Sequence, residues 1–144
     1  MTEEGSRPLV SRAYAKLNLA STTVAPGGPF SPVTSPDGSL LARYRKIHSF
    51  SPAGEAQAFT AGSEIVTFPW NGFTVAPAIC YDLRFPELFR AATAAGADLF
   101  CVIANWPDRR QQHKTILLRA RAIENQAFVL GLNRCSSDPH FNYA

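Results

Sequence analysis

A cysteine and a lysine are the two residues of this chain best suited to do chemistry together. Cys80 ends an apolar, strand-like run and precedes a polar stretch at residues 81–87, while Lys46 lies in the basic segment 43–48. A nearby ammonium group or helix N-terminus lowers the pKa of a thiol and raises its thiolate fraction. Such a thiolate attacks carbonyl or nitrile carbon, and a fixed cation with backbone N–H groups stabilises the resulting oxyanion. The pair therefore predicts nucleophilic catalysis, with the general base still to be identified.

The other cysteines have structural explanations as well as chemical ones. A free cysteine at a strand end is commonly a buried packing residue, which leaves Cys80 undecided on composition alone. Cys101 lies inside an apolar run and is expected in the core. Cys135 is either an accessory thiol or a plain loop residue. None of the three forms a Cys-x-x-Cys pair, so neither a disulfide framework nor a metal site is predicted.

Three histidines could each act as the base of a Cys–His pair. Single histidines at unrelated spacings are more often surface or capping residues, so this alternative is the weaker one. The residues concerned are His48, His113 and His140. Two tryptophans are also candidates for a site. Trp70 stands beside a predicted turn and is expected to pack there, whereas Trp106 either lines a pocket or packs in the core.

Composition limits the class of protein. The chain has 144 residues, of which 46% are hydrophobic, and this is enough for a single domain with its own core. The formal net charge of +3 comes from scattered basic residues, so nucleic-acid binding is not predicted. No apolar run approaches the roughly 20 residues that cross a bilayer. These features, with the cysteine pattern, predict a cytoplasmic protein without membrane partners, cofactor or metal.

Turn residues divide the chain into two regions. Residues 1–36 are rich in proline and glycine and are expected to be irregular, and residues 37–144 are expected to form the domain. A short strand is predicted at 40–44. Asn71 and Gly72 separate two further strands, at 64–68 and from Phe73 to Cys80, and this dipeptide favours a hairpin turn. Pro77 donates no ladder hydrogen bond, which predicts an edge, a bulge or a local break there.

Helices and buried strands alternate in the second half. Pro86 and Gly96 bracket a predicted helix, because proline suits a first helical turn and glycine a C-terminal stop. Continuous apolar runs at 99–104 and 127–132 predict strands buried on both faces. A second helix is predicted at 110–125, with an apolar stripe as its buried face. That stripe consists of Ile116, Ala120 and Ile123.

This alternation is typical of a layered α/β fold with helices covering a sheet. Chemistry in open sheets of this kind gathers at the carboxyl ends of the strands. Cys80, Asn105 and Asn133 each follow or end such a strand. The sequence therefore predicts that these three residues converge on one edge of the sheet.

Two motifs of the chain resemble those of a known family. Residues 44–48 (YRKIH) followed by 79–87 (ICYDLRFPE) are similar to the nitrilase superfamily of carbon–nitrogen hydrolases, and 105–107 (NWP) and 120–126 (ARAIENQ) extend the match. The resemblance is strongest to the omega-amidase-like branch. It implies an α/β fold of the α-β-β-α sandwich type. It also implies a hydrolase that converts a small linear omega-amide to a carboxylate and ammonia through a cysteine thioester.

The resemblance also implies roles for individual residues. Cys80 corresponds to the nucleophile and Lys46 to the lysine of the family's Glu–Lys–Cys triad, and the N–H of Tyr81 completes the oxyanion hole. Glu55 resembles the second, supporting glutamate, with a solvated loop carboxylate as its alternative. The match around Asn105 and Trp106 places these two at the substrate.

The departures from the family pattern predict an incomplete centre. The family's general-base glutamate lies well before the lysine motif, and the role is not transferred to Glu3 or Glu4, which match no motif. No strand is expected before the turn at 36–38, and family members continue beyond Ala144. We therefore expect a partial domain lacking N- and C-terminal elements. The alternative function is a catalytically incomplete fragment or pseudoenzyme. Relatives associate through surface helices, which implies a homodimer.

Overall fold

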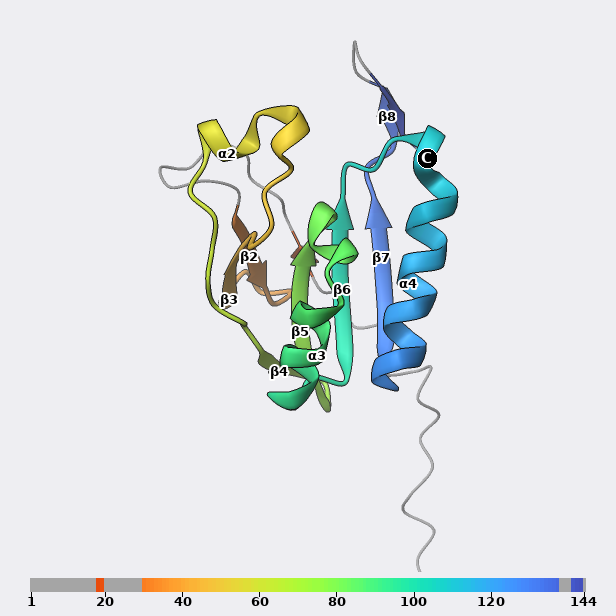
Figure 1. Cartoon of the computed structure of the whole chain (residues 1–144). Coiled ribbons are helices and arrows are strands. Elements are labelled where there is room, and N and C mark those ends of the chain that lie inside the picture. Colours follow the sequence, from red (N-terminus) through yellow and green to blue (C-terminus); the bar gives the residue numbers. More distant parts are fainter. Residues whose placement is uncertain (1–17, 20–29, 138–140, 144) are drawn as a thin grey trace, which may run out of the picture.

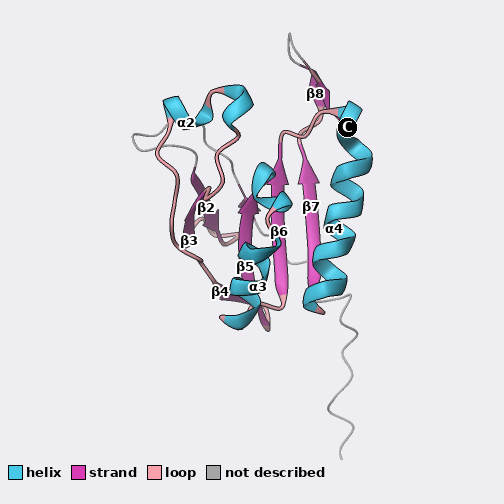
Figure 2. Cartoon of the chain, viewed as in Figure 1, coloured by secondary structure: helices cyan, strands magenta, loops and turns pink. Residues whose placement is uncertain are grey.

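The computed structural model describes residues 18–19, 30–137 and 141–143, which form an α/β fold (Figures 1 and 2). The strands are β1 (Asn18–Leu19), β2 (Phe30–Thr34), β3 (Leu40–Arg45), β4 (Phe68–Trp70), β5 (Phe73–Ile79), β6 (Leu99–Ala104), β7 (Phe128–Asn133), β8 (Ser136–Ser137) and β9 (Asn142–Tyr143). The α-helices are α2 (Glu55–Ala58), α3 (Pro86–Ala94) and α4 (Gln111–Asn125). Short 3-10 helices are η1 (Ser51–Ala53), η2 (Cys80–Arg84) and η3 (Asp108–Arg110). None of the described helices is long and apolar enough to cross a membrane.

The central sheet has the order β4-β5-β6-β7, and its last three strands are parallel. Helices α3 and α4 cover one face of this sheet (Figure 1). The antiparallel sheet β1-β2-β3 packs on the other face, where Val33 of β2 meets Val75 and Leu99. These are consecutive α, β and β layers, as the sequence predicts.

Successive side chains of a strand point to opposite sides, and a layer covers each face of the sheet at β5 and β6. Both strands are therefore buried on both faces. Ala76 and Ala78 face the helices together with Phe100 and Val102. The alternate residues, such as Cys101, face the second sheet. The prediction that Cys101 is a core residue is confirmed, since its side chain is fully buried.

Several local predictions are confirmed at the turns. Asn71 and Gly72 have φ of +49° and +84°, the positive values that the hairpin turn requires. Helix α3 begins at Pro86 and ends just before Gly96, whose φ is +93°. Strand β4 pairs with β5 only as far as Val75, so among the described residues β5 is an edge beside Pro77.

Helix α4 has a different buried face from the one predicted. Ile116 and Ile123 are 56% and 78% exposed, whereas Lys114 and Arg121 are buried. Leu117 and Leu118, on the same side of the helix, pack against the hydrophobic core. Both stripes have helical spacing, and the buried one contains Arg121, whose Nε donates to the main-chain carbonyl of Leu83 in η2. The prediction made from hydrophobicity alone is therefore wrong.

Three strand predictions are also corrected. β7 is buried on its helix face only, and its other face exposes Phe128, Leu130 and Leu132, because β1-β2-β3 does not extend over it. Residues 30–34 were expected to be irregular, yet they form β2, which pairs with β3 up to the turn at residues 35–38. The division at residue 36 otherwise stays a prediction. The first hairpin strand lies at 68–70, later than the predicted 64–68.

Candidate active site

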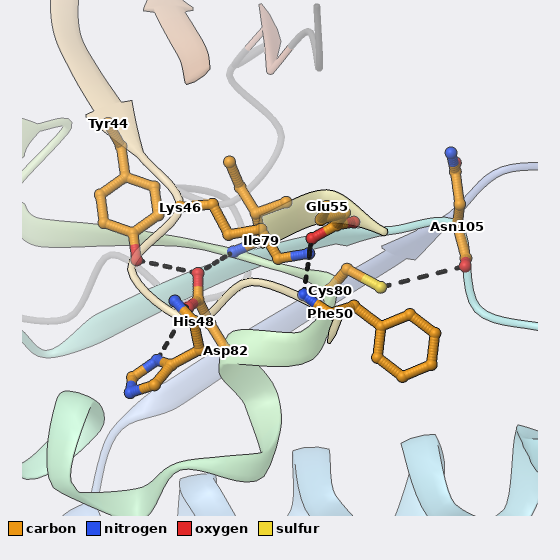
Figure 3. Close-up of polar contacts among 9 residues, drawn as sticks. All are labelled: Tyr44, Lys46, His48, Phe50, Glu55, Ile79, Cys80, Asp82 and Asn105. Carbon is orange, nitrogen blue, oxygen red and sulfur yellow. Dashed lines mark hydrogen bonds and ion pairs between the residues drawn. The ribbon is translucent and has the colours of Figure 1, made fainter. Parts of the chain in front are cut away.

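Cys80 occupies a strained position at the carboxyl end of β5. Its φ is +48°, in the left-handed region that residues other than glycine rarely adopt, and such conformations cluster at functional sites. The turn directs the chain from the strand into η2. Its Sγ lies 3.9 Å from the main-chain oxygen of Asn105, which follows β6 (Figure 3). Two of the three strand ends predicted to converge are thus in contact.

Lys46 reaches the same place from the end of β3. Its side chain is only 2% exposed, and Nζ donates to Oε2 of Glu55 at 2.5 Å (Figure 3). The same carboxylate oxygen accepts the main-chain N–H of Phe50 at 2.8 Å. Because a lone buried ammonium group is unfavourable, Glu55 provides the counter-charge that keeps Lys46 in place.

A pocket of about 420 Å³ brings all the predicted site residues together. They come from β3, α2, the β5–η2 junction and the segment after β6. The predicted residues that line it are Lys46, Glu55, Cys80, Tyr81, Asn105 and Trp106. Within the described parts of the chain, Glu55 is the only carboxylate in its wall. The pocket has the size of small-molecule sites.

Trp106 is held in the pocket wall by three hydrogen bonds. Its main-chain N–H and C=O pair with the side-chain amide of Asn133 at 2.8 and 2.9 Å. Its indole N–H donates to the carbonyl of Arg110 at 2.9 Å. The predicted convergence of Asn133 is therefore real, but its contact is with Trp106, which it fixes beside Asn105.

A buried aspartate that sequence reasoning missed joins the lysine and cysteine segments. Asp82, fully buried, accepts the Tyr44 hydroxyl at 2.8 Å and the main-chain N–H of Ile79 at 3.0 Å (Figure 3). It also contacts the main-chain N–H and Nδ1 of His48, both at 2.9 Å. Tyr44 and His48 flank Lys46, and Ile79 precedes Cys80. The sequence feature that could have indicated this network is the spacing of Tyr44 and His48. They lie two residues before and two residues after Lys46, and therefore on one face of an extended chain.

Neither of the two histidines that the structure describes, His48 and His113, is placed to act as a base for Cys80. His48 Nδ1 is engaged by Asp82, and its ring stacks on Phe85 with centroids 3.7 Å apart. His113 is exposed on α4 and is not among the residues lining the pocket. His140 lies outside the described residues, as do Glu3 and Glu4.

The pKa of the Cys80 thiol is raised, which corrects the expectation of a preformed thiolate. Burial is the main cause, because it disfavours the charged form. The ammonium group of Lys46 and the hydrogen bond to Asn105 act in the opposite direction, as predicted, but they do not outweigh burial. Glu55 and Asp82 raise the pKa further. The resting side chain is therefore a thiol, and an attack requires that a base remove its proton.

This balance predicts the pH dependence of Cys80 alkylation. We expect the midpoint for iodoacetamide labelling, followed by peptide mass spectrometry, to lie above that of free cysteine, about 8.5. In Lys46→Met the midpoint should rise further, because the charge that stabilises the thiolate is lost. Arg119→Met removes a charge from the exposed side of α4 and should leave the midpoint unchanged. A midpoint at or below that of free cysteine would contradict the prediction.

Comparison with known proteins gives a consistent picture. The model of the family described as carbon-nitrogen hydrolase matches residues 32–141. "Omega-amidase YafV" of Yersinia enterocolitica is 46% identical over 106 residues, covering 74% of this chain and 40% of the relative. The "2-oxoglutaramate amidase" of Bacillus subtilis (strain 168) is 40% identical over 112 residues, covering 78% and 43%.

A solved structure shows the same arrangement of elements. XC1258 from Xanthomonas campestris, described as a CN-hydrolase superfamily protein, has a TM-score of 0.77 and 33% identity, covering 89% of this chain and 51% of that one. The chain thus spans less than half the length of the two curated relatives and about half of this solved one.

Proposed function

The chain belongs to the carbon–nitrogen hydrolase family, and on that premise we propose that its pocket is an amidase centre for small linear omega-amides. The observation that carries the proposal is the meeting of Cys80 and Lys46 in one pocket, with Cys80 held at positive φ. The names of the relatives, omega-amidase and 2-oxoglutaramate amidase, support this class of substrate. The proposed products are a carboxylate and ammonia.

In the proposed reaction, Cys80 forms the bond to the acyl carbon. Its Sγ loses a proton to a base and attacks the amide carbon, and the carbonyl oxygen becomes an oxyanion stabilised by Lys46 Nζ and the N–H of Tyr81. The carbon–nitrogen bond then breaks, and the nitrogen leaves as ammonia after it takes up a proton. Water attacks the thioester, which releases the carboxylate and restores the thiol.

Glu55 acts in this scheme through Lys46. Its carboxylate holds the ammonium group at 2.5 Å and is anchored by the N–H of Phe50. The main-chain oxygen of Asn105 accepts a hydrogen bond from the Cys80 thiol and so restricts its orientation. Trp106 forms the wall against which the substrate's carbon chain packs.

One observation favours the second candidate, a chain that binds an amide without turning it over. Among the described residues, the Sγ of Cys80 has the carbonyl of Asn105 as its hydrogen-bond acceptor, and a carbonyl cannot take up the thiol proton. The carboxylate lining the pocket, Glu55, is already bonded to Lys46 and Phe50. Without a positioned base, rates fall typically 10²–10⁴-fold.

Incubation with 2-oxoglutaramate tests both candidates. We expect an acyl adduct on the peptide containing Cys80, with none on the peptides of Cys101 or Cys135, and release of ammonia. Continued ammonia release beyond one equivalent supports the amidase. Protection of Cys80 from alkylation by the amide, with neither adduct nor ammonia, supports the incomplete centre, because a thiol without a base is not activated for attack. Absence of both adduct and ammonia would overturn the proposed function. The homodimer stays a prediction, which sedimentation of the purified chain checks.

A further inference from the structure

Helix α4 contains a buried arginine that takes no part in the pocket. Arg121 is only 4% exposed, and it is not among the residues that line the pocket. It belongs to the segment 120–126 (ARAIENQ), to which the proposed reaction gives no role. A buried charge is unfavourable unless hydrogen bonds and an opposite charge compensate it. The partners of Arg121 therefore indicate what this residue holds in place.

The guanidinium group of Arg121 contacts three elements at once. Its Nε donates to the main-chain carbonyl of Leu83 in η2 at 3.1 Å, and its Nη1 donates to Oε1 of Glu124 in α4 at 2.7 Å. The same group lies over the ring of Phe89 in α3, 5.4 Å from the centroid. A planar fork can make all three contacts together, whereas the compact ammonium group of a lysine cannot. Arg121 thus connects α4 with α3 and with the turn that begins at Cys80.

Asn125 fixes this part of α4 against the neighbouring helix α3 (Figure 1). Its Nδ2 donates to the main-chain oxygen of Arg121 at 2.9 Å. Its Oδ1 accepts the hydroxyl of Thr93, near the end of α3, at 3.3 Å. Arg121, Glu124 and Asn125 all lie in the segment 120–126, so this segment links the two helices and presents the guanidinium group to η2.

The turn that Arg121 reaches is the one that orients the nucleophile. Cys80, the first residue of η2, has a φ of +48°, and such a conformation persists only when the surrounding structure holds it. Asp82 fixes the start of the turn, because its carboxylate accepts the N–H of Ile79 at 3.0 Å. Carbonyls near the end of a helical turn lack partners within it, and Arg121 supplies a donor to the fully buried Leu83. Two charged side chains therefore hold η2, one at each end.

We propose that Arg121 is a positioning residue, which acts through the Leu83 carbonyl to hold η2 and with it the Sγ of Cys80 and the N–H of Tyr81. The inference rests on the proposed function only for the reaction that this geometry serves. Without the guanidinium group, the buried carbonyl of Leu83 has to turn towards water. The turn that carries Cys80 moves with it.

Arg121 acts on the thiol through position rather than through its own charge. Burial is the largest cause of the raised pKa of Cys80, and the charged side chains that also shift this pKa are those of Lys46, Glu55 and Asp82. A loosened η2 exposes the thiol and removes part of this burial. Loss of Arg121 should therefore lower the pKa of Cys80, although it makes the thiol less well placed to attack an amide.

The Arg121→Met variant tests this role with two measurements of opposite sign. The pH midpoint for iodoacetamide labelling of Cys80 should fall towards about 8.5, the value of free cysteine. The rate at which 2-oxoglutaramate acylates Cys80 should fall by ~10²-fold, because a displacement of about 1 Å at the reacting atoms can cost that much. Arg121→Lys keeps the charge and one donor, and should lie between Arg121→Met and the unchanged chain in both measurements.

Cys101 reports in the same sample whether the whole domain opens. It is fully buried between the two sheets, so its labelling should stay slow in Arg121→Met. Leu118→Ala is the matched variant, because Leu118 packs on the core from the same helix and lies over Gly131 of β7 instead of η2. This variant should lower the free energy of unfolding and leave the midpoint of Cys80 unchanged.

Two results would overturn the inference. One is a midpoint and an acylation rate at Cys80 that stay unchanged in Arg121→Met. The other is labelling of Cys101 that rises in parallel with that of Cys80 in both Arg121 variants, since Arg121 then supports only the fold as a whole. Arg121→Lys decides the case in which Arg121→Met does not fold, because a midpoint equal to that of the unchanged chain would then contradict the proposal.

The positioning role and the proposed function can fail separately. The labelling midpoint needs no turnover, so it tests Arg121 even if the unchanged chain forms no acyl adduct. In that case the amidase proposal falls, and a midpoint that moves as expected supports the positioning role. If the unchanged chain and Arg121→Met form the adduct at the same rate, the amidase proposal stands and the positioning role is wrong.

Discussion

The Cys80→Ala variant is expected to form no acyl adduct with 2-oxoglutaramate and to release ammonia at the uncatalysed rate. Removal of a catalytic nucleophile costs about 10⁶-fold in a well-studied hydrolase, and an effect of this order applies to whatever rate the unchanged chain shows. Neither of the other cysteines can substitute, because Cys101 is fully buried in the core and Cys135 does not line the pocket. Mass spectrometry of the intact chain and an ammonia assay measure the result.

Two controls make the nucleophile prediction specific. Alanine at position 80 meets the same backbone strain as cysteine, so thermal unfolding should show little change in stability. Cys135→Ser removes an exposed thiol and should keep both the adduct and the ammonia release. An adduct that persists in Cys80→Ala, or that vanishes in Cys135→Ser, would contradict the assignment.

Asp82→Ala is expected to lower the free energy of unfolding by about 3–5 kcal/mol, the usual cost of removing one partner from a buried charged network. Four donors lose their acceptor: the Tyr44 hydroxyl, the N–H of Ile79, and two groups of His48. Buried donors without acceptors retain their full desolvation penalty. Urea unfolding followed by tryptophan fluorescence gives the change.

The same variant tests whether Asp82 positions the site. Asp82 itself raises the pKa of the Cys80 thiol, so loss of its charge alone should lower the pH midpoint for alkylation, whereas displacement of Lys46, which lowers that pKa, should raise the midpoint. Tyr44→Phe removes one of the four donors and should give a fraction of the stability loss, because it leaves no donor unpaired. Glu64→Ala, at an exposed carboxylate, should stay within about 0.5 kcal/mol. If Asp82→Ala lowers the free energy of unfolding by no more than Glu64→Ala does, the hydrogen-bond network of Asp82 is not needed for stability.

Local signals were sufficient where an element's ends are decided by backbone chemistry. The Asn71–Gly72 turn, the start of α3 at Pro86 and its stop before Gly96 follow from the conformations that these residues allow. The continuous apolar run of β6 and the helical spacing in α4 are long enough to identify both elements, to within a residue of their bounds. Such features depend on near neighbours, which a sequence displays directly.

Predictions failed where the outcome depends on which layers are brought together. Ile123 and Arg121 both lie on plausible stripes of α4, and the buried one is decided by the Leu83 carbonyl, which accepts Arg121 Nε at 3.1 Å. The open face of β7 reflects the limited width of β1-β2-β3. Helical or strand periodicity contains no information about the extent of a neighbouring layer.

By itself, the sequence determined the family, the α/β order of elements and the residues that meet in the pocket. Motif spacing and turn residues are local properties, which can be identified from the order of the amino acids alone. The tertiary structure alone decided the state of that pocket. Burial makes Cys80 a thiol despite Lys46, and Asp82 joins segments that are distant in sequence. Desolvation and the balance of charges depend on everything packed around a group, and this exists only after folding.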